Sequence, residues 1–262
     1  MDATTAARKA QEAIAAGVFQ SNDDNALFAY DAGAVSNSNP IWQDLINQAN
    51  LHYYGPSNYF INTLIQWNDP RLPLLFTKDP NGNYSGGTVG TGNSSTALSS
   101  FSAQWLSPSF SGDLLDYSEA QFLLAEAVER GFSSNGTAQQ YYNNAITASI
   151  LFWGGNTTDA ATYLAQPAVA YNTATGDWRQ KIGYQKWIAF ANRNWDSWTE
   201  IRRLGYPNLD VVNPPVGANG NLPLRFYYPP AEQSSNPANW ENAVQALPGG
   251  QDVVSAKLFW KP

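Results

Sequence analysis

Cysteine is absent from this 262-residue chain, and histidine occurs once. Without cysteine, neither disulfide bonds nor thiol catalysis is available. Lysine and arginine number 14 against 21 aspartates and glutamates, which gives a formal net charge of −7. A protein that binds nucleic acid or anionic lipid head groups needs a basic patch, and this composition offers none. We therefore expect no nucleic-acid partner.

Long apolar runs are also missing. No segment approaches the roughly 18 consecutive apolar residues that a membrane-spanning helix needs. The first residues, Met1 to Thr4, show none of the regions of a signal peptide. We expect a protein that is either cytosolic or begins downstream of its export signal.

Hydrolytic chemistry has little support. The lone His52 has no cysteine partner, and the chain contains no Gly-x-Ser-x-Gly motif, so a nucleophilic triad is poorly supported. Asp196 and Glu200 lie one helical turn apart and could form an acid–base pair. Arg193 and Arg203 each stand three residues from one of these carboxylates, which favours a salt-bridged helix face instead. A glycoside hydrolase is therefore a less favoured alternative.

Aromatic residues are unusually numerous, with 10 Trp, 14 Tyr and 12 Phe. Most are expected in the core, because each can bury roughly 150–250 Å² of surface. The functional alternative is a set of flat apolar plates that stack on sugar rings while Asn, Gln and Asp bind the hydroxyls. Composition alone does not choose between the two.

Residues 116–153 predict a hairpin of two helices. Asp116 with Glu119, and Thr137 with Gln140, have the spacing of capping boxes, and Gly131 follows the first apolar stripe as a C-terminal cap. Small residues on both stripes allow close approach, as in a tetratricopeptide-type unit. The same patterns predict further elements: helices at residues 3–16, 40–53, 57–67, 158–170, 182–204 and 237–246, and a short strand at 224–228.

Residues 78–112 differ from the rest of the chain. Six glycines and nine serines in 35 residues predict a long surface loop, with a hairpin at Asn81-Gly82. Long loops in compact domains are usually either functional or disordered. This one carries four aromatic residues that a plain linker would not need: Tyr84, Phe101, Trp105 and Phe110.

Residues 79–83 resemble the start of a calcium-binding loop. An EF-hand, however, needs glycine where Tyr84 stands and glutamate where Gly90 stands. The glycine cluster at 87–92 lacks the Gly-Lys-Ser/Thr ending of a P-loop. We therefore expect no metal and no cofactor.

Four separated segments carry a resemblance to a known family: YSEAQFLLAEA (117–127), WDSWTEIRRLGYP (195–207), WNDPRL (67–72) and LPLRFYYPPAEQ (222–233), with KLFW (257–260) fitting as well. Together they resemble the SusD/RagB family of outer-membrane nutrient-binding lipoproteins. The order of the segments is that of the family, and they span nearly the whole chain.

This resemblance implies a mainly α fold, with tetratricopeptide-like helix hairpins, long loops and a few short strands, in a single region 1–262. It implies a non-catalytic protein at the outer surface of the outer membrane, which captures oligosaccharides, or sometimes peptides, for a SusC-like TonB-dependent transporter. Family members are about twice as long. We therefore expect this chain to correspond to their C-terminal part, without the lipid-bearing cysteine and the first helical repeats.

The resemblance also points to the loop at residues 78–112 as a place for sugar-stacking aromatics, although no short motif aligns within it. Trp105 is the first candidate, followed by Tyr84 and Phe101, with Asn83 or Gln104 as polar partners. The alternative for Trp105 is packing of the loop onto the scaffold. A peptide-binding or protein-interaction scaffold of the same fold remains the main alternative function.

Overall fold

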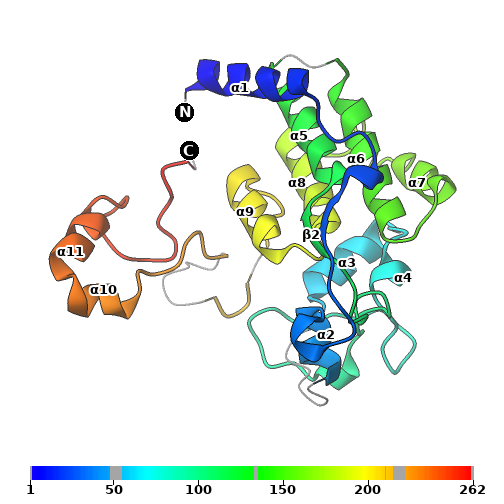
Figure 1. The fold of residues 1–262 in the computed structure, drawn as a ribbon, viewed down its shortest axis with the longest axis horizontal. Helices are drawn as coiled ribbons and strands as arrows, with labels where there is room; N and C mark the ends of the chain where they lie inside the picture. The colour runs from blue at the N-terminus through cyan, green and yellow to red at the C-terminus, as the bar shows by residue number, and fades with distance from the viewer. Residues whose placement is uncertain (1, 48–54, 133–134, 210, 215–221, 261–262) are drawn as a thin grey trace.

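The computed structural model describes residues 2–47, 55–132, 135–209, 211–214 and 222–260, and in these the chain is mainly helical (Figure 1). The predicted fold class is confirmed. The longer helices are α1 (Ala3–Ala16), α3 (Asn58–Gln66), α5 (Tyr117–Glu129), α6 (Ala138–Phe152), α7 (Thr157–Leu164), α8 (Trp178–Ala189), α9 (Asn194–Leu204), α10 (Pro230–Ser235) and α11 (Pro237–Gln245). The helices α2 (Pro40–Trp42) and α4 (Leu72–Leu75) are single turns.

The predicted hairpin is formed by α5 and α6. Asp116 caps α5 by accepting a hydrogen bond from the Glu119 amide, and Thr137 caps α6 by accepting one from the Gln140 amide. Gly131 follows α5 with a φ of +74°, a conformation that favours glycine. The two helices pack with α7 and α8 around one core, made of these residues: Phe122, Ala125, Ala138, Tyr142, Ala145, Ile146, Ile150, Ala160, Tyr163, Val169, Tyr171, Ile182, Ala189, Phe190 and Leu204.

The predicted helix at 182–204 is wrong, because the chain turns between α8 and α9. Phe190 ends α8, and α9 begins after Arg193, whose φ of −125° and ψ of 64° lie outside the helical region. The turn lets α9 fold back onto α8. Trp195, near the start of α9, is exposed.

The predicted strand at 224–228 is also wrong, since no ladder forms there. Leu224 donates its amide to the Val254 carbonyl over 2.8 Å, and the Arg225 side chain forms an ion pair with Asp252. A pair of short antiparallel strands occurs elsewhere: β1 (Ala26–Phe28) pairs with β2 (Gly112–Leu115). For the helix predicted at 40–53, the structure shows α2 and one π-helical turn (Gln43–Asn47), and residues 48–54 lie outside the described part.

A second core is formed by side chains of α3, α4, α8 and the segment 78–112, with the residues that follow α4 and α6: Ile61, Leu64, Leu72, Leu75, Phe76, Trp105, Trp153, Trp187 and Ile188. The helices and the segment that contribute to it are seen in Figure 1. Arg71 stands at its border and is fully buried. Its guanidinium forms an ion pair with Asp69 at 2.6 Å and donates to Ser149 on α6 and to Gln185 on α8, each over 3.0 Å. The Asp-Pro-Arg segment therefore ties the start of α4 to the central helices.

The C-terminal helices α10 and α11 lie to one side of the α5–α8 bundle (Figure 1). The segment that leads to them is held by α9: Trp198 Nε1 donates to the Pro223 carbonyl over 2.8 Å, and Arg202 donates to the Leu224 carbonyl over 3.0 Å. The Arg202 guanidinium also lies 3.6 Å from the centre of the Trp198 ring. In the described part of the chain, no helix combines the length and apolarity needed to cross a bilayer.

Candidate functional site

The long loop predicted at 78–112 is fastened to the scaffold at several points. Beside the start of α3, the Asn58 amide donates to the Gly87 carbonyl over 2.8 Å, and the Gly87 amide donates to the Pro56 carbonyl over 2.9 Å. After α4, the Thr77 amide donates to the Ser100 carbonyl over 2.8 Å. These hydrogen bonds fix the loop as one wall of two adjoining pockets.

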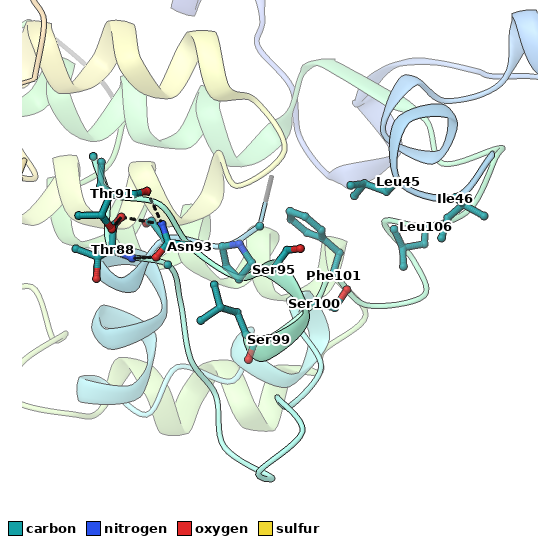
Figure 2. A pocket seen from close by; sticks show the side chains of 17 residues that line it. Leu45, Ile46, Thr88, Thr91, Asn93, Ser95, Ser99, Ser100, Phe101 and Leu106 are labelled. Atoms are coloured by element: carbon teal, nitrogen blue, oxygen red, sulfur yellow. Dashed lines mark hydrogen bonds between the residues drawn. The ribbon is translucent and has the colours of Figure 1, made fainter. Parts of the chain in front are cut away.

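The first pocket, here called the hydroxyl pocket, has a volume of about 520 Å³ (Figure 2). Small polar side chains come from the loop, and apolar ones come from both the π-helical turn and the loop. The described residues that line it are Leu45, Ile46, Gly55, Pro56, Ser57, Gly87, Thr88, Val89, Gly90, Thr91, Asn93, Ser95, Leu98, Ser99, Ser100, Phe101 and Leu106. Its volume lies in the range of small-molecule sites, roughly 300–1,000 Å³.

Asn93 shapes the polar wall of the hydroxyl pocket. Its Oδ1 accepts a hydrogen bond from the Thr88 amide over 2.9 Å, and its Nδ2 donates to the carbonyls of Thr88 and Thr91 (Figure 2). The Asn93 side chain is thus committed to the loop itself. The side-chain hydroxyls of Thr88, Ser95 and Ser100, by contrast, form no hydrogen bond with any described residue, and they are free to bind a ligand.

The second pocket, here called the aromatic pocket, has a volume of about 420 Å³ and shares Gly55, Pro56, Ser57 and Phe101 with the first. Aromatic rings dominate its lining: Phe60, Phe76, Phe101, Trp105, Trp187 and Phe190. Several of them pack edge to face, as in the pair Phe60–Trp187, whose ring centroids are 4.9 Å apart. Two polar residues from the start of α9, Asn194 and Ser197, complete the lining.

Neither pocket has a charged side chain among the described residues that line it. Charged residues next to the lining residues of α8 and α9 pair with other charged side chains and hold α9 in place. Arg193 lies 2.6 Å from Glu119 on α5 and 2.9 Å from Asp196, and Lys186 on α8 lies 3.0 Å from Glu200. Uncharged linings of this kind suit uncharged ligands, because an ion would lose its hydration without gaining a partner.

The Asp196 and Glu200 carboxylates lie in this salt-bridge network, as the favoured interpretation of the sequence predicted. Glu200 binds both Lys186 and Arg203, the latter at 2.6 Å. Burial opposes its ionisation, but the charges of Lys186 and Arg203 outweigh burial and lower its pKa. A carboxylate held ionised in this way has no proton to donate at neutral pH.

Trp105 lies in the second core, with only 4% of its surface exposed. Its ring stacks on Trp153, with 5.1 Å between centroids and an interplanar angle of 23°. The structure therefore favours the packing alternative for this residue: Trp105 forms part of the wall of the aromatic pocket but offers no open face to a sugar ring. Phe101 lies half-buried where the two pockets meet.

The remaining sequence candidates lie elsewhere. Tyr84 and Asn83 line a separate depression of about 350 Å³, and the Lys78 ammonium lies 5.9 Å from the centre of the Tyr84 ring. Gln104 lines none of these pockets. The structure thus brings Phe101 and Trp105 together at the aromatic pocket, places Asn83 and Tyr84 together at the separate depression, and leaves Gln104 outside both.

Sequence reasoning missed the polar residues of both pockets. Ser57 was placed only at the start of the helix predicted at 57–67, and in the structure it accepts a hydrogen bond from the Phe60 amide over 3.2 Å. Asn194 was placed inside a continuous helix, although asparagines on both sides of Arg193 are a signal for a helix boundary. Thr88 had no distinguishing signal, because its role depends on how the loop folds.

Comparisons with known proteins agree with this architecture. The model of the SusD-like family, described as "starch-binding associating with outer membrane", matches residues 1–229. No curated protein matches the sequence. Similar solved structures include a chitin-binding protein (29% identity, TM-score 0.80, 98% of this chain and 59% of that one). Similar structures also include a SusD homologue from Bacteroides fragilis (28% identity, TM-score 0.78, 93% of this chain and 58% of that one). Another is a SusD homologue from Bacteroides thetaiotaomicron (26% identity, TM-score 0.81, 99% of this chain and 60% of that one). The chain thus spans less than two thirds of the length of these proteins.

Proposed function

Because this chain belongs to the SusD-like family, we propose that it is a non-catalytic glycan-binding protein. It acts at the outer surface of the outer membrane and passes captured oligosaccharide to a SusC-like TonB-dependent transporter. The ligand-binding surface is formed by the hydroxyl pocket and the aromatic pocket, which meet at Phe101.

One observation carries this proposal: an array of unused hydroxyls adjoins a pocket lined by aromatic rings. A sugar presents hydroxyl groups around the edge of its ring and C–H groups on its faces, so it needs both kinds of surface. Thr88, Ser95 and Ser100 can exchange hydrogen bonds with sugar hydroxyls, and the Phe101 ring can contact an apolar sugar face. The described residues of both linings carry no charge, which fits starch and chitin, the neutral polymers named for the family and for one similar structure.

The non-catalytic part of the proposal is supported by the carboxylates of α9. Asp196 and Glu200 are bound to arginine and lysine side chains and line neither pocket. Glycoside hydrolysis needs one carboxylic acid that is protonated and a second carboxylate across the scissile bond. Incubation of the protein with the oligosaccharides that it binds should therefore release no shorter products.

The test is calorimetric titration with a panel of neutral oligosaccharides, using Thr88→Val and Tyr84→Ala. Thr88→Val removes one pocket hydroxyl and keeps the side-chain shape, so affinity should fall about 2- to 10-fold, the value of one hydrogen bond. Tyr84→Ala changes the separate depression and should leave affinity unchanged. The opposite result, with Tyr84→Ala weakening the binding and Thr88→Val having no effect, would overturn the assignment of the site.

The peptide-binding alternative makes a different prediction. A peptide ligand would be held through its backbone amides and side chains, so the same titration with a peptide library would give saturable binding while the sugar panel gave none.

The proposed transporter partner is tested separately. A tagged form of this protein should retain a TonB-dependent transporter from detergent-solubilised outer membranes of the source organism. Retention that is lost when untagged Thr88→Val protein is added in excess would show that the two proteins compete for the same partner.

A further inference from the structure

We propose that the aromatic pocket recognises the acetamido group of an N-acetylated amino sugar, and that the protein therefore prefers such sugars to neutral sugars without this group. This inference rests on the proposed function, because it names the class of glycan that the two pockets bind. The residues that carry it are Asn194 and Ser197, with the aromatic rings opposite them.

Ser197 is the first observation. Only 8% of this residue is exposed, and its hydroxyl forms no hydrogen bond with any described residue. The hydroxyl oxygen is nevertheless not sealed from solvent, although it has no partner among the described residues. Because Ser197 lines the aromatic pocket, the small exposed part of the residue faces the space that a ligand would fill.

Asn194 is the second observation. It stands three residues before Ser197, so the two side chains share one face of α9. Its amide forms no side-chain hydrogen bond in the described part of the chain, whereas Asn39 caps a helix and Asn93 fixes a loop. The Asn194 amide offers both a donor and an acceptor at the edge of the pocket.

Apart from Ser57, whose hydroxyl caps α3, the remaining described residues that line the pocket are mostly apolar. Phe76 is 4% exposed and Trp187 is 8% exposed, so these rings form a wall with few polar atoms. An acetamido group has one N–H donor, one carbonyl acceptor and one methyl group. The methyl suits the rings, while the N–H and the carbonyl suit Ser197 and Asn194.

Charge adds a further criterion. No charged side chain lines the aromatic pocket among the described residues, so a protonated amine would lose its hydration there without a carboxylate to replace it. A deacetylated amino sugar should therefore bind more weakly than the acetylated sugar. A sugar with a plain hydroxyl in place of the acetamido group would leave the ring surface that contacts the methyl group empty. Affinity should then fall roughly fourfold, before any hydrogen bond is lost.

The experiment is a calorimetric comparison of three β-1,4-linked tetrasaccharides of equal length: N-acetylglucosamine, glucosamine and glucose oligomers. We expect the N-acetylglucosamine tetramer to bind at least tenfold more tightly than the glucose tetramer, and the glucosamine tetramer to bind most weakly at a pH where its amines are charged. The double variant Asn194→Ala/Ser197→Ala should lose the preference for the acetylated oligomer. Thr199→Ala, on the same helix but lining neither pocket, should keep it.

A positive readout comes from Asn194→Asp, which places a carboxylate of similar shape at the pocket edge. This variant should bind the glucosamine tetramer more tightly than the unaltered protein does, and the N-acetylglucosamine tetramer less tightly. If the glucose and N-acetylglucosamine tetramers bind equally well to the unaltered protein, the acetamido assignment is wrong while glycan binding stands. If no glycan in the wider panel binds to the folded protein, the proposed function itself fails.

Discussion

Gly86 holds the loop wall of the hydroxyl pocket close to α3, and its replacement gives a sharp test of the site. A Cβ atom added at Gly86 would lie 2.4 Å from both the carbonyl carbon and the carbonyl oxygen of Ser57, and 2.6 Å from the Asn58 nitrogen. These are backbone atoms at the start of α3, which cannot turn aside as a side chain can. Gly86→Ala must therefore push the loop and the helix apart by about 1 Å, the distance needed to restore ordinary van der Waals contact.

The cost follows from the hydrogen bonds beside this contact. Separation weakens the bond from the Asn58 amide to Gly87, at 2.8 Å, and the bond from the Gly87 amide to Pro56, at 2.9 Å. Two hydrogen bonds at about 1 kcal/mol each give a loss of about 2 kcal/mol in the free energy of unfolding. The displaced wall carries Thr88, so glycan affinity should fall by about tenfold as well.

The control is Gly92→Ala in the same loop, where an added Cβ would meet no atom within 4 Å. Urea unfolding should place Gly92→Ala within about 0.5 kcal/mol of the unaltered protein, as is usual for surface substitutions. Glycan titration should show unchanged affinity for this control. Equal stability and equal affinity for the two alanine variants would refute the close approach of the loop to α3.

Three further perturbations test other parts of the structure. Arg71→Leu leaves the buried Asp69 carboxylate without its partner and should cost about 3–5 kcal/mol in urea unfolding. Trp105→Ala removes a core ring stacked on Trp153 and should lower the free energy of unfolding by about 3–5 kcal/mol. Any loss of glycan binding should therefore accompany a loss of stability, and an unchanged urea midpoint would contradict the core position. Burial and the nearby charge of Asp116 raise the pKa of Asp113 to about 8. Because the folded protein then holds a proton that the unfolded chain releases near pH 4, stability should fall as pH rises from about 4 towards 8. Urea midpoints measured across that range should show a flatter decline for Asp113→Asn.

The elements that the sequence predicted best are those with local causes. The α5–α6 hairpin was predicted from its capping residues, its apolar spacing and Gly131, all of which act within a few residues of each other. The break between α8 and α9 was missed because the apolar period continues through it. What ends α8 is the tertiary packing of α9 and the salt bridges of Arg193 to α5.

The site was predicted less well, since pockets are made by segments far apart in the chain. The loop at 78–112 was correctly identified as distinct, yet its composition could not reveal the backbone hydrogen bonds that fasten it to α3. Trp105 and Phe101 look alike in sequence, but only packing against Trp153 decides that Trp105 belongs to the core. The β1–β2 pair joins residues more than 80 positions apart, and neither strand has enough length for an alternating pattern.

The fastening of the loop has a consequence for the way in which a sugar is selected. A segment that must become ordered on binding can adjust its side chains to several ligands, but it loses conformational entropy in doing so. Here the polar wall is already held by Asn93 and by the contacts of Gly87. Its hydroxyls are therefore already spaced in the absence of a ligand. Under the proposed function, a sugar that differs only in the orientation of one hydroxyl should bind more weakly, because the wall cannot rearrange to meet it.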